Sequence, residues 1–146
     1  MKKTKNISLL LVDDHAFFLK SLRKFLKDHD EVVHVLGQAR DGRRAIEKVR
    51  VLSPDVTIMD INMPGMDGIE TTRRLVAGGA KTRILILSMC TDPGQIKNAL
   101  AAGAAGFVRK DSVDRELLPA IQTVHCGRIY KCHSAALNGR MTRVRT

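Results

Sequence analysis

The alternation of apolar runs with helical patterns is the feature that most limits the fold of this chain. Five short runs rich in Val, Ile and Leu are separated by segments in which apolar residues recur at helical spacing. The runs are Ile7–Val12, Val32–Ala39, Asp55–Met59, Arg83–Ser88 and Gly106–Arg109. Strands alternating with helices are typical of a parallel sheet covered by helices on both faces. The pattern predicts a doubly wound α/β domain with five strands and five helices, but not the order of the strands.

Local signals place the ends of several helices. Four residues stand where a helix N-cap is expected: Asp41, Asp67, Asp92 and Ser112. Pro54 is expected to stop the second helix, because the residue before a proline avoids helical geometry. Pro119 falls inside the last apolar stripe, so we expect either a kink there or a late start of the last helix.

The composition limits the class of protein. At 146 residues the chain fits one domain, and a hydrophobic content of 44% with only 3% aromatics predicts an aliphatic core. No apolar run approaches the roughly 18 residues of a membrane span, and no signal-peptide core follows the N-terminal lysines. Three cysteines without an export signal are expected to be reduced thiols. We therefore expect a soluble cytoplasmic protein that does not enter a membrane.

The net charge of +10 lies mainly at the two ends of the chain. Residues 6–125 hold 17 basic and 15 acidic residues, whereas the segment from Cys126 to Thr146 holds five basic residues and no acid. One interpretation is a pair of solvated termini. The other is a basic linker that leads toward, or assists, a DNA-binding partner.

Charged and hydroxyl side chains stand at or just after the ends of four of the predicted strands. They are Asp13, Asp14, Asp60, Ser88 and Lys110. The carboxyl ends of parallel strands meet at one edge of the sheet, where ligands bind. Two carboxylates about 4 Å apart repel by roughly 4 kcal/mol at an effective dielectric of 20, so a compensating charge is needed. Lys110 supplies one, and the oxygen-only ligand set suits Mg²⁺ for the remainder.

A carboxylate at such a site can act as a nucleophile toward phosphorus and form an aspartyl phosphate. The transfer then needs alignment and charge neutralisation, which Lys110 and the metal would provide. The added charge of about −1.5 to −2 would draw in the hydroxyl of Ser88. Pro64 and Gly65 force a turn after Asp60 that could aim a backbone carbonyl at the metal.

Together these motifs resemble the receiver domain of two-component response regulators. The resemblance rests on Asp13-Asp14, on Asp60 with the segment Met63–Gly68, and on Ser88 and Lys110, and it spans about residues 7–130. It implies a flavodoxin-like fold with five strands in the order 2-1-3-4-5. It also implies a signalling phosphoacceptor that catalyses only its own phosphorylation and slow dephosphorylation, and not an enzyme acting on other substrates.

The resemblance also implies roles for the acidic residues. Asp60 would accept the phosphoryl group from a sensor histidine kinase. Asp14 and the backbone carbonyl of Asn62 would join Asp60 around Mg²⁺, for which Mn²⁺ can substitute, and Asp13 would act largely through water. Phe17, at the start of the first helix, is the better candidate for a contact with the kinase, because Phe18 continues the core stripe.

Three further residues would carry the response. By resemblance, Ser88 and Lys110 would bind phosphoryl oxygens, while Ser88 and Phe107 would act as the switch. Phosphorylation would alter the face built from the helix after Asp92, the last strand and the last helix. Homodimerisation on that face is the expected consequence.

Smaller motifs resemble the LuxR-type (NarL-like) subfamily of receivers. They are Leu87-Ser88-Met89, the segment 103–111 and Gly127-Arg128-Ile129-Tyr130. We expect a receiver over residues 1–130 and a basic tail or linker over residues 131–146.

No recognition-helix pattern follows Tyr130. Either a DNA-binding output domain has been removed, through which the protein controls transcription, or the chain is a stand-alone receiver that acts through protein–protein contacts. The composition favours the first.

Two other classes of function are open at this stage. A phosphohydrolase can also form an aspartyl phosphate, but such enzymes commonly place a second acid two residues after the nucleophile, where this chain has Asn62. Direct nucleic-acid binding through the basic ends lacks an aromatic stacking platform, since only Tyr130 lies near the tail.

Overall fold

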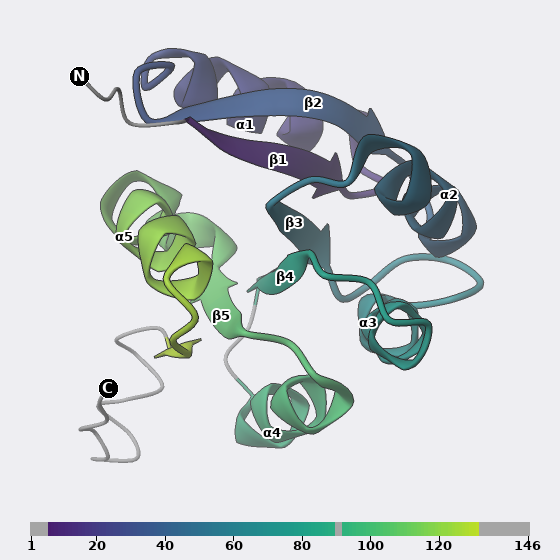
Figure 1. The fold of residues 1–146 in the computed structure, drawn as a ribbon. Coiled ribbons are helices and arrows are strands. Elements are labelled where there is room, and N and C mark those ends of the chain that lie inside the picture. The colour runs from purple at the N-terminus through teal and green to yellow at the C-terminus, as the bar shows by residue number, and fades with distance from the viewer. Residues whose placement is uncertain (1–5, 90–91, 132–146) are drawn as a thin grey trace.

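The computed structural model describes residues 6–89 and 92–131, and it forms an α/β sandwich (Figure 1). The predicted tail lies almost entirely outside these residues. The strands are β1 (Ile7–Val12), β2 (Val33–Ala39), β3 (Val56–Asp60), β4 (Arg83–Ser88), β5 (Gly106–Arg109) and β6 (Tyr130–Lys131). The helices are α1 (Ala16–Lys27), α2 (Gly42–Leu52), α3 (Gly68–Ala77), α4 (Pro93–Ala102), α5 (Val113–His125) and the short 3₁₀ helix η1 (Lys110–Ser112).

All pairings in the sheet are parallel, and the strand order is β2-β1-β3-β4-β5-β6. The expected doubly wound fold and five α-helices are confirmed, but five strands was wrong, because β6 adds a sixth beside β5. A strand of two residues is too short to be recognised from a repeating pattern of apolar residues.

Two contacts accompany the position of β6. The Tyr130 hydroxyl donates to Oε1 of Glu116 at 2.7 Å. Gly106 lets β6 approach, since a Cβ there would lie 3.0 Å from the Tyr130 carbonyl oxygen.

The opposite edge of the sheet contains an irregularity. In the pairing of β1 with β2, Leu9 faces Val35 whereas Leu10 faces Gly37. Leu36 is therefore left out of the register as a bulge, with 37% of its surface exposed.

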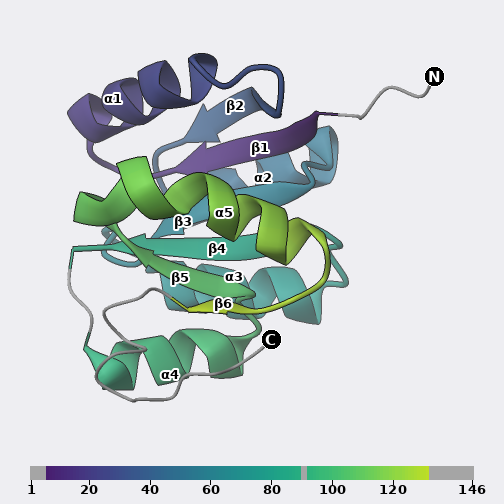
Figure 2. The ribbon, with the colours of Figure 1, turned by 90° about the vertical axis from the view of Figure 1, so that its left-hand side faces the viewer.

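The helices form two layers, one on each face of the sheet (Figure 2). Helices α1 and α5 cover one face, and their buried leucines, isoleucine and valine pack against Leu9, Leu11 and Ile58. Helices α2, α3 and α4 cover the other face, which presents Leu10 and Ile86 among others. Both faces of the central strands are therefore buried, which explains why β3 and β4 read as continuous apolar runs.

The predicted helix starts are largely confirmed. The carboxylates of Asp41 and Asp67 accept from the backbone N–H three residues on at 2.8 Å, and Asp92 accepts from that of Gly94 at 3.0 Å. Ser112 precedes α5 without a side-chain capping bond. Helix α2 ends at Leu52, before Pro54, as expected.

Helix α5 runs through Pro119, so a late start at this residue was wrong. The proline removes one intrahelical hydrogen bond. Because Pro119 is exposed, water can bond to the carbonyl group that lacks its helical partner.

The loop between β3 and α3 is folded tightly against the end of β3. The Gly68 N–H donates to the Ile61 carbonyl at 2.8 Å. A Cβ on Gly68 would lie 2.1 Å from the Asp60 carbonyl oxygen and 2.9 Å from Cα of Ile61. Only glycine fits here, because the first turn of α3 touches the backbone of Asp60.

Gly68→Ala is therefore expected to lower the free energy of unfolding by about 1–3 kcal/mol, the usual range for overpacking. Gly94→Ala is the matched control near the start of α4, because its Cβ would meet its nearest neighbour, Oδ1 of Asp92, at an ordinary 3.5 Å. This control should be neutral or stabilise by up to about 1 kcal/mol. Urea denaturation of both variants measures the difference, and equal stabilities would contradict the close contact at Gly68.

Candidate functional site

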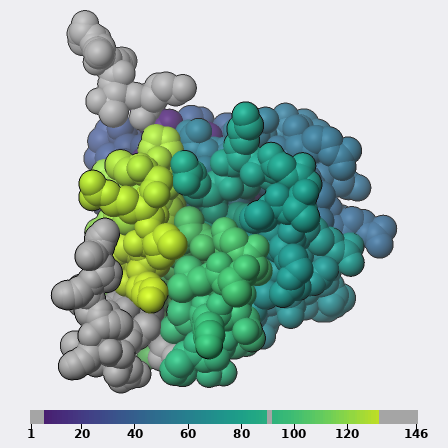
Figure 3. Space-filling model, turned by 60° about the horizontal axis from the view of Figure 1, so that its bottom comes forward, coloured from purple at the N-terminus to yellow at the C-terminus, as the bar shows by residue number. Residues whose placement is uncertain are grey.

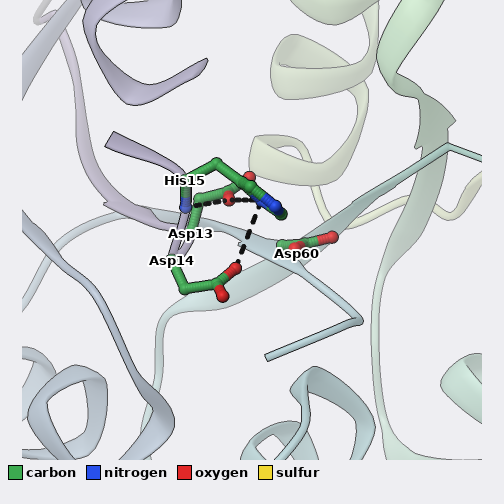
Figure 4. Close-up of side chains that lie close together, drawn as sticks. All are labelled: Asp13, Asp14, His15 and Asp60. Carbon is green, nitrogen blue, oxygen red and sulfur yellow. Dashed lines mark hydrogen bonds and ion pairs between the residues drawn. The ribbon is translucent and has the colours of Figure 1, made fainter. Parts of the chain in front are cut away.

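Two strands bring the acidic residues together at the carboxyl edge of the sheet. Asp13 and Asp14 follow the last residue of β1, and Asp60 is the last residue of β3. The Asp13 N–H donates to the Ala39 carbonyl at 3.1 Å, which extends the pairing of β1 with β2 to the site. Figure 4 shows the Asp13, Asp14 and Asp60 side chains gathered with that of His15. The convergence predicted from the sequence is thus present.

Lys110 neutralises part of this charge. Its Nζ lies 2.7 Å from Oδ2 of Asp13 and 3.5 Å from Oδ1 of Asp60, and only 7% of its side chain is exposed. The same Nζ sits 4.4 Å from the ring centroid of Phe18 in α1. A buried ammonium needs such partners, since an unpaired buried charge is strongly destabilising. The end of β5 is thereby joined to the ends of β1 and β3.

His15 is the site residue that sequence reasoning missed. Its Nδ1 lies 3.1 Å from Oδ1 of Asp13 and 3.2 Å from Oδ1 of Asp14 (Figure 4). Its backbone N–H also donates to Oδ1 of Asp13 at 2.9 Å, and α1 begins at the next residue. The available signal was its position directly after two acids at the end of a strand.

Burial raises the pKa of the Asp60 carboxyl above its ordinary value, and the negative charge of Asp13 raises it further. The charge of Lys110 and a hydrogen bond from the Asn62 N–H act in the opposite direction and do not cancel the first two effects. Asp60 is 3% exposed. Its ionised form is therefore held in the folded protein at a free-energy cost.

The donor set fits a hard divalent cation. Ligand atoms of Asp13, Asp14, His15 and Asp60 all lie within 4.8 Å of one another. Oδ2 of Asp60 is buried without a hydrogen-bond partner, and the buried Oδ1 of Asp14 has only the ring nitrogen of His15 beside it, at 3.2 Å. An unsatisfied buried carboxylate oxygen is costly, and a cation that prefers oxygen ligands would satisfy that of Asp60. The cluster can therefore bind a metal ion.

The other predicted site residues lie on neighbouring elements. Ser88 is fully buried at the end of β4, one residue past Leu87, which pairs with Asp60. Phe107 is fully buried in the core beneath α2, α3 and α4. Asn62 is exposed two residues after β3, and its N–H faces the Asp60 carboxylate. Phe17 is 82% exposed, while Phe18 packs inward.

Three carboxylates and a buried lysine thus lie together at the carboxyl edge of a doubly wound parallel sheet, the place where α/β proteins of this kind carry their binding sites. The sequence profile of the response regulator receiver domain matches residues 9–122. The chain belongs to this family, as its motifs predicted, and a receiver domain is a signalling module.

Named relatives point to the LuxR type of receiver, as expected. Response regulator GacA of Pseudomonas viridiflava is 36% identical over 124 residues, and UvrY of Escherichia coli K12 is 35% identical over the same length. Each alignment covers 85% of this chain but only 58% and 56% of the relative, respectively. The chain thus spans somewhat more than half the length of these relatives.

Solved structures agree with this assignment. A LuxR-family response regulator from Aurantimonas sp. SI85-9A1 superposes with a TM-score of 0.85 at 32% identity, covering 91% of this chain and 94% of that one. The receiver domain of the putative regulator NarL from Mycobacterium tuberculosis gives a TM-score of 0.81 at 34% identity, covering 86% and 100%. The fold is therefore flavodoxin-like, as the resemblance implied.

No helix within the described residues is long and apolar enough to cross a membrane.

The raised pKa of Asp60 makes a prediction about stability. Since the folded state binds this proton more tightly than the unfolded state, stability falls as the pH rises from the ordinary value through the raised pKa, and the loss is complete above it. Asp60→Asn should therefore raise the free energy of unfolding at pH 7, by about 1 kcal/mol, in metal-free buffer. The gain should shrink as the pH approaches 3.

Urea denaturation in EDTA at both pH values measures this gain. Asp55→Asn is the control at the other end of β3, where Oδ2 of Asp55 accepts from the Ser8 N–H at 2.9 Å. This control should show no gain at pH 7. A destabilised Asp60→Asn protein would contradict the electrostatic account.

Proposed function

We propose that Asp60 accepts a phosphoryl group from a sensor histidine kinase. A carboxylate oxygen of Asp60 would form the new bond to phosphorus, and the bond from phosphorus to the donor would break, its electron pair leaving with the donor. The observation that carries this proposal is the buried Asp60 carboxylate, with one oxygen 3.5 Å from Nζ of Lys110 and the other without a partner.

The neighbouring groups would bind and orient the phosphoryl group. Lys110 would offset the negative charge on the phosphoryl oxygens, and the Ser88 hydroxyl would donate to one of them. Asp13, Asp14, Asp60 and the Asn62 backbone carbonyl would hold Mg²⁺ or Mn²⁺, Asp13 largely through water. The bound cation would neutralise charge as it develops in the transfer.

The protein would be a phosphoacceptor that catalyses only its own phosphorylation and slow dephosphorylation. Position 62 carries an amide where a hydrolase commonly has a second acid. Asn62 can neither donate nor remove a proton as a general acid or base. Slow loss of the phosphoryl group and no sustained turnover of phosphomonoesters are the expected properties.

The response would pass through Ser88 and Phe107 to the face formed by α4, β5 and α5. Figure 3 shows α4 (green) beside the end of α5 and β6 (yellow-green) on one side of the molecule. Residues 1–130 would form the receiver and residues 131–146 a tail or linker. Homodimerisation would present a DNA-binding output domain to its target.

Intact-protein mass spectrometry after incubation with a small phosphodonor tests the chemistry. Wild type should gain one phosphoryl group in the presence of Mg²⁺ and none in EDTA, because the acidic cluster needs the cation. Asp60→Asn should gain none. Asp55→Asn, at the far end of the same strand, should react like wild type, and an adduct on Asp60→Asn would overturn the assignment.

Sedimentation velocity tests the consequence. The phosphorylated protein should shift toward a dimer, whereas Asp60→Asn treated in the same way should sediment as the untreated protein does. If mass spectrometry shows a phosphoryl adduct but the sedimentation coefficient does not change, dimerisation is not the output. The phosphoacceptor role would still stand.

A further inference from the structure

A cavity lies at the end of the sheet opposite to Asp60. A cavity of about 690 Å³ opens where β3 and β4 begin, between the last turns of α2 and α3, with Gly79 and Lys81 in the loop that follows α3. Gly79 has a φ of +83°, and a Cβ there would meet no atom within 4 Å. This volume is in the range of small-molecule sites, about 300–1,000 Å³.

The cavity is strongly cationic. Arg50, Lys81 and Arg83 line it, and within the described residues none of their side chains has a hydrogen-bond or ion-pair partner. Asp55 is the single acid among the lining residues, and its carboxylate accepts from the Ser8 N–H. The three cations therefore outnumber the one acid of the lining, and the cavity keeps an excess of positive charge.

Helix ends explain only part of this charge. Cations favour the last turn of a helix, and Arg50 in α2 and Arg74 in α3 occupy such positions. Arg74 is already paired with Glu70 at 2.9 Å. Lys81 and Arg83 lie beyond α3, in the loop and at the start of β4, so they are outside the last turn of any helix.

The inner wall of the cavity is apolar. Val49, Pro54 and Leu75 line it, and all three are buried, with Val49 and Leu75 exposing 6% and 4% of their surface. A few charged groups at the mouth of an apolar hollow are the usual arrangement for binding a small molecule that has a charged end and an apolar body.

We infer that this cavity binds a small organic anion that carries a phosphate group on an apolar or aromatic body. The phosphate meets the guanidinium groups of Arg50 and Arg83 and the ammonium group of Lys81, which all donate hydrogen bonds to its oxygens. The body packs against Val49 and Leu75. This site is separate from the acidic one at the carboxyl edge, so it stands or falls independently of the proposed phosphorylation of Asp60.

AMP serves as the probe, because it joins a phosphate dianion to an aromatic base. Titration of ¹⁵N-labelled protein in EDTA should shift the backbone amides of Gly78, Gly79 and Thr82 and leave that of Asp60 unmoved. Adenosine lacks the charge and inorganic phosphate lacks the body, so each should bind at least about tenfold more weakly, a difference of about 1.4 kcal/mol.

The variant Arg50→Gln with Arg83→Gln should weaken AMP binding at least about tenfold. Both side chains are exposed and unpartnered within the described chain, so the fold should be retained, as a thermal melt can verify. Arg43→Gln with Lys48→Gln is the control of equal charge on α2 outside the cavity. Three results would each overturn the proposal. They are an equal loss of AMP affinity in both double variants, inorganic phosphate binding as tightly as AMP, and chemical-shift changes confined to the amides around Asp60.

Discussion

The ammonium group of Lys110 is the interaction on which the site depends. It contacts Asp13 at 2.7 Å and Asp60 at 3.5 Å in a region almost closed to water. Without it, the carboxylates at the ends of β1 and β3 would repel one another with no local counter-charge. The same ammonium group links the end of β5 to the acidic residues and contacts the ring of Phe18 in α1. The electrostatics of the site and the packing of α1 are therefore determined together.

The backbone around Asp60 is equally constrained. The Gly68 N–H and the Ile61 carbonyl hold the start of α3 against the end of β3, and the carboxylate of Asp67 caps that helix. Reactive side chains are positioned most accurately on rigid elements, and Asp60 belongs to a central strand buried on both faces. The exposed Asn62 lies just beyond this rigid part.

The sequence predicted the layers, most strand limits and the convergence of Asp60 with Lys110, because strand ends in a parallel sheet must meet at one edge. The sequence did not predict features that leave no repeating pattern of apolar residues. Strand β6 has two described residues, and it is held by backbone pairing with β5 and by the hydrogen bond from Tyr130 to Glu116. His15 has no pattern of its own, and the cationic cavity joins residues from separate elements. The roles of all the site residues, from Asp60 and Lys110 to Ser88 and Phe107, stay predictions, since geometry alone does not test them.

The two borders of the sheet also bear on how the protein avoids aggregation. A long, flat border strand offers its free N–H and C=O groups to other chains. Within the described residues β6 offers only two, and the bulge at Leu36 interrupts the regular spacing of β2. As far as the structure describes them, both borders are therefore poor templates for intermolecular strand pairing, which disfavours self-association through the backbone of a chain whose central strands are almost wholly apolar.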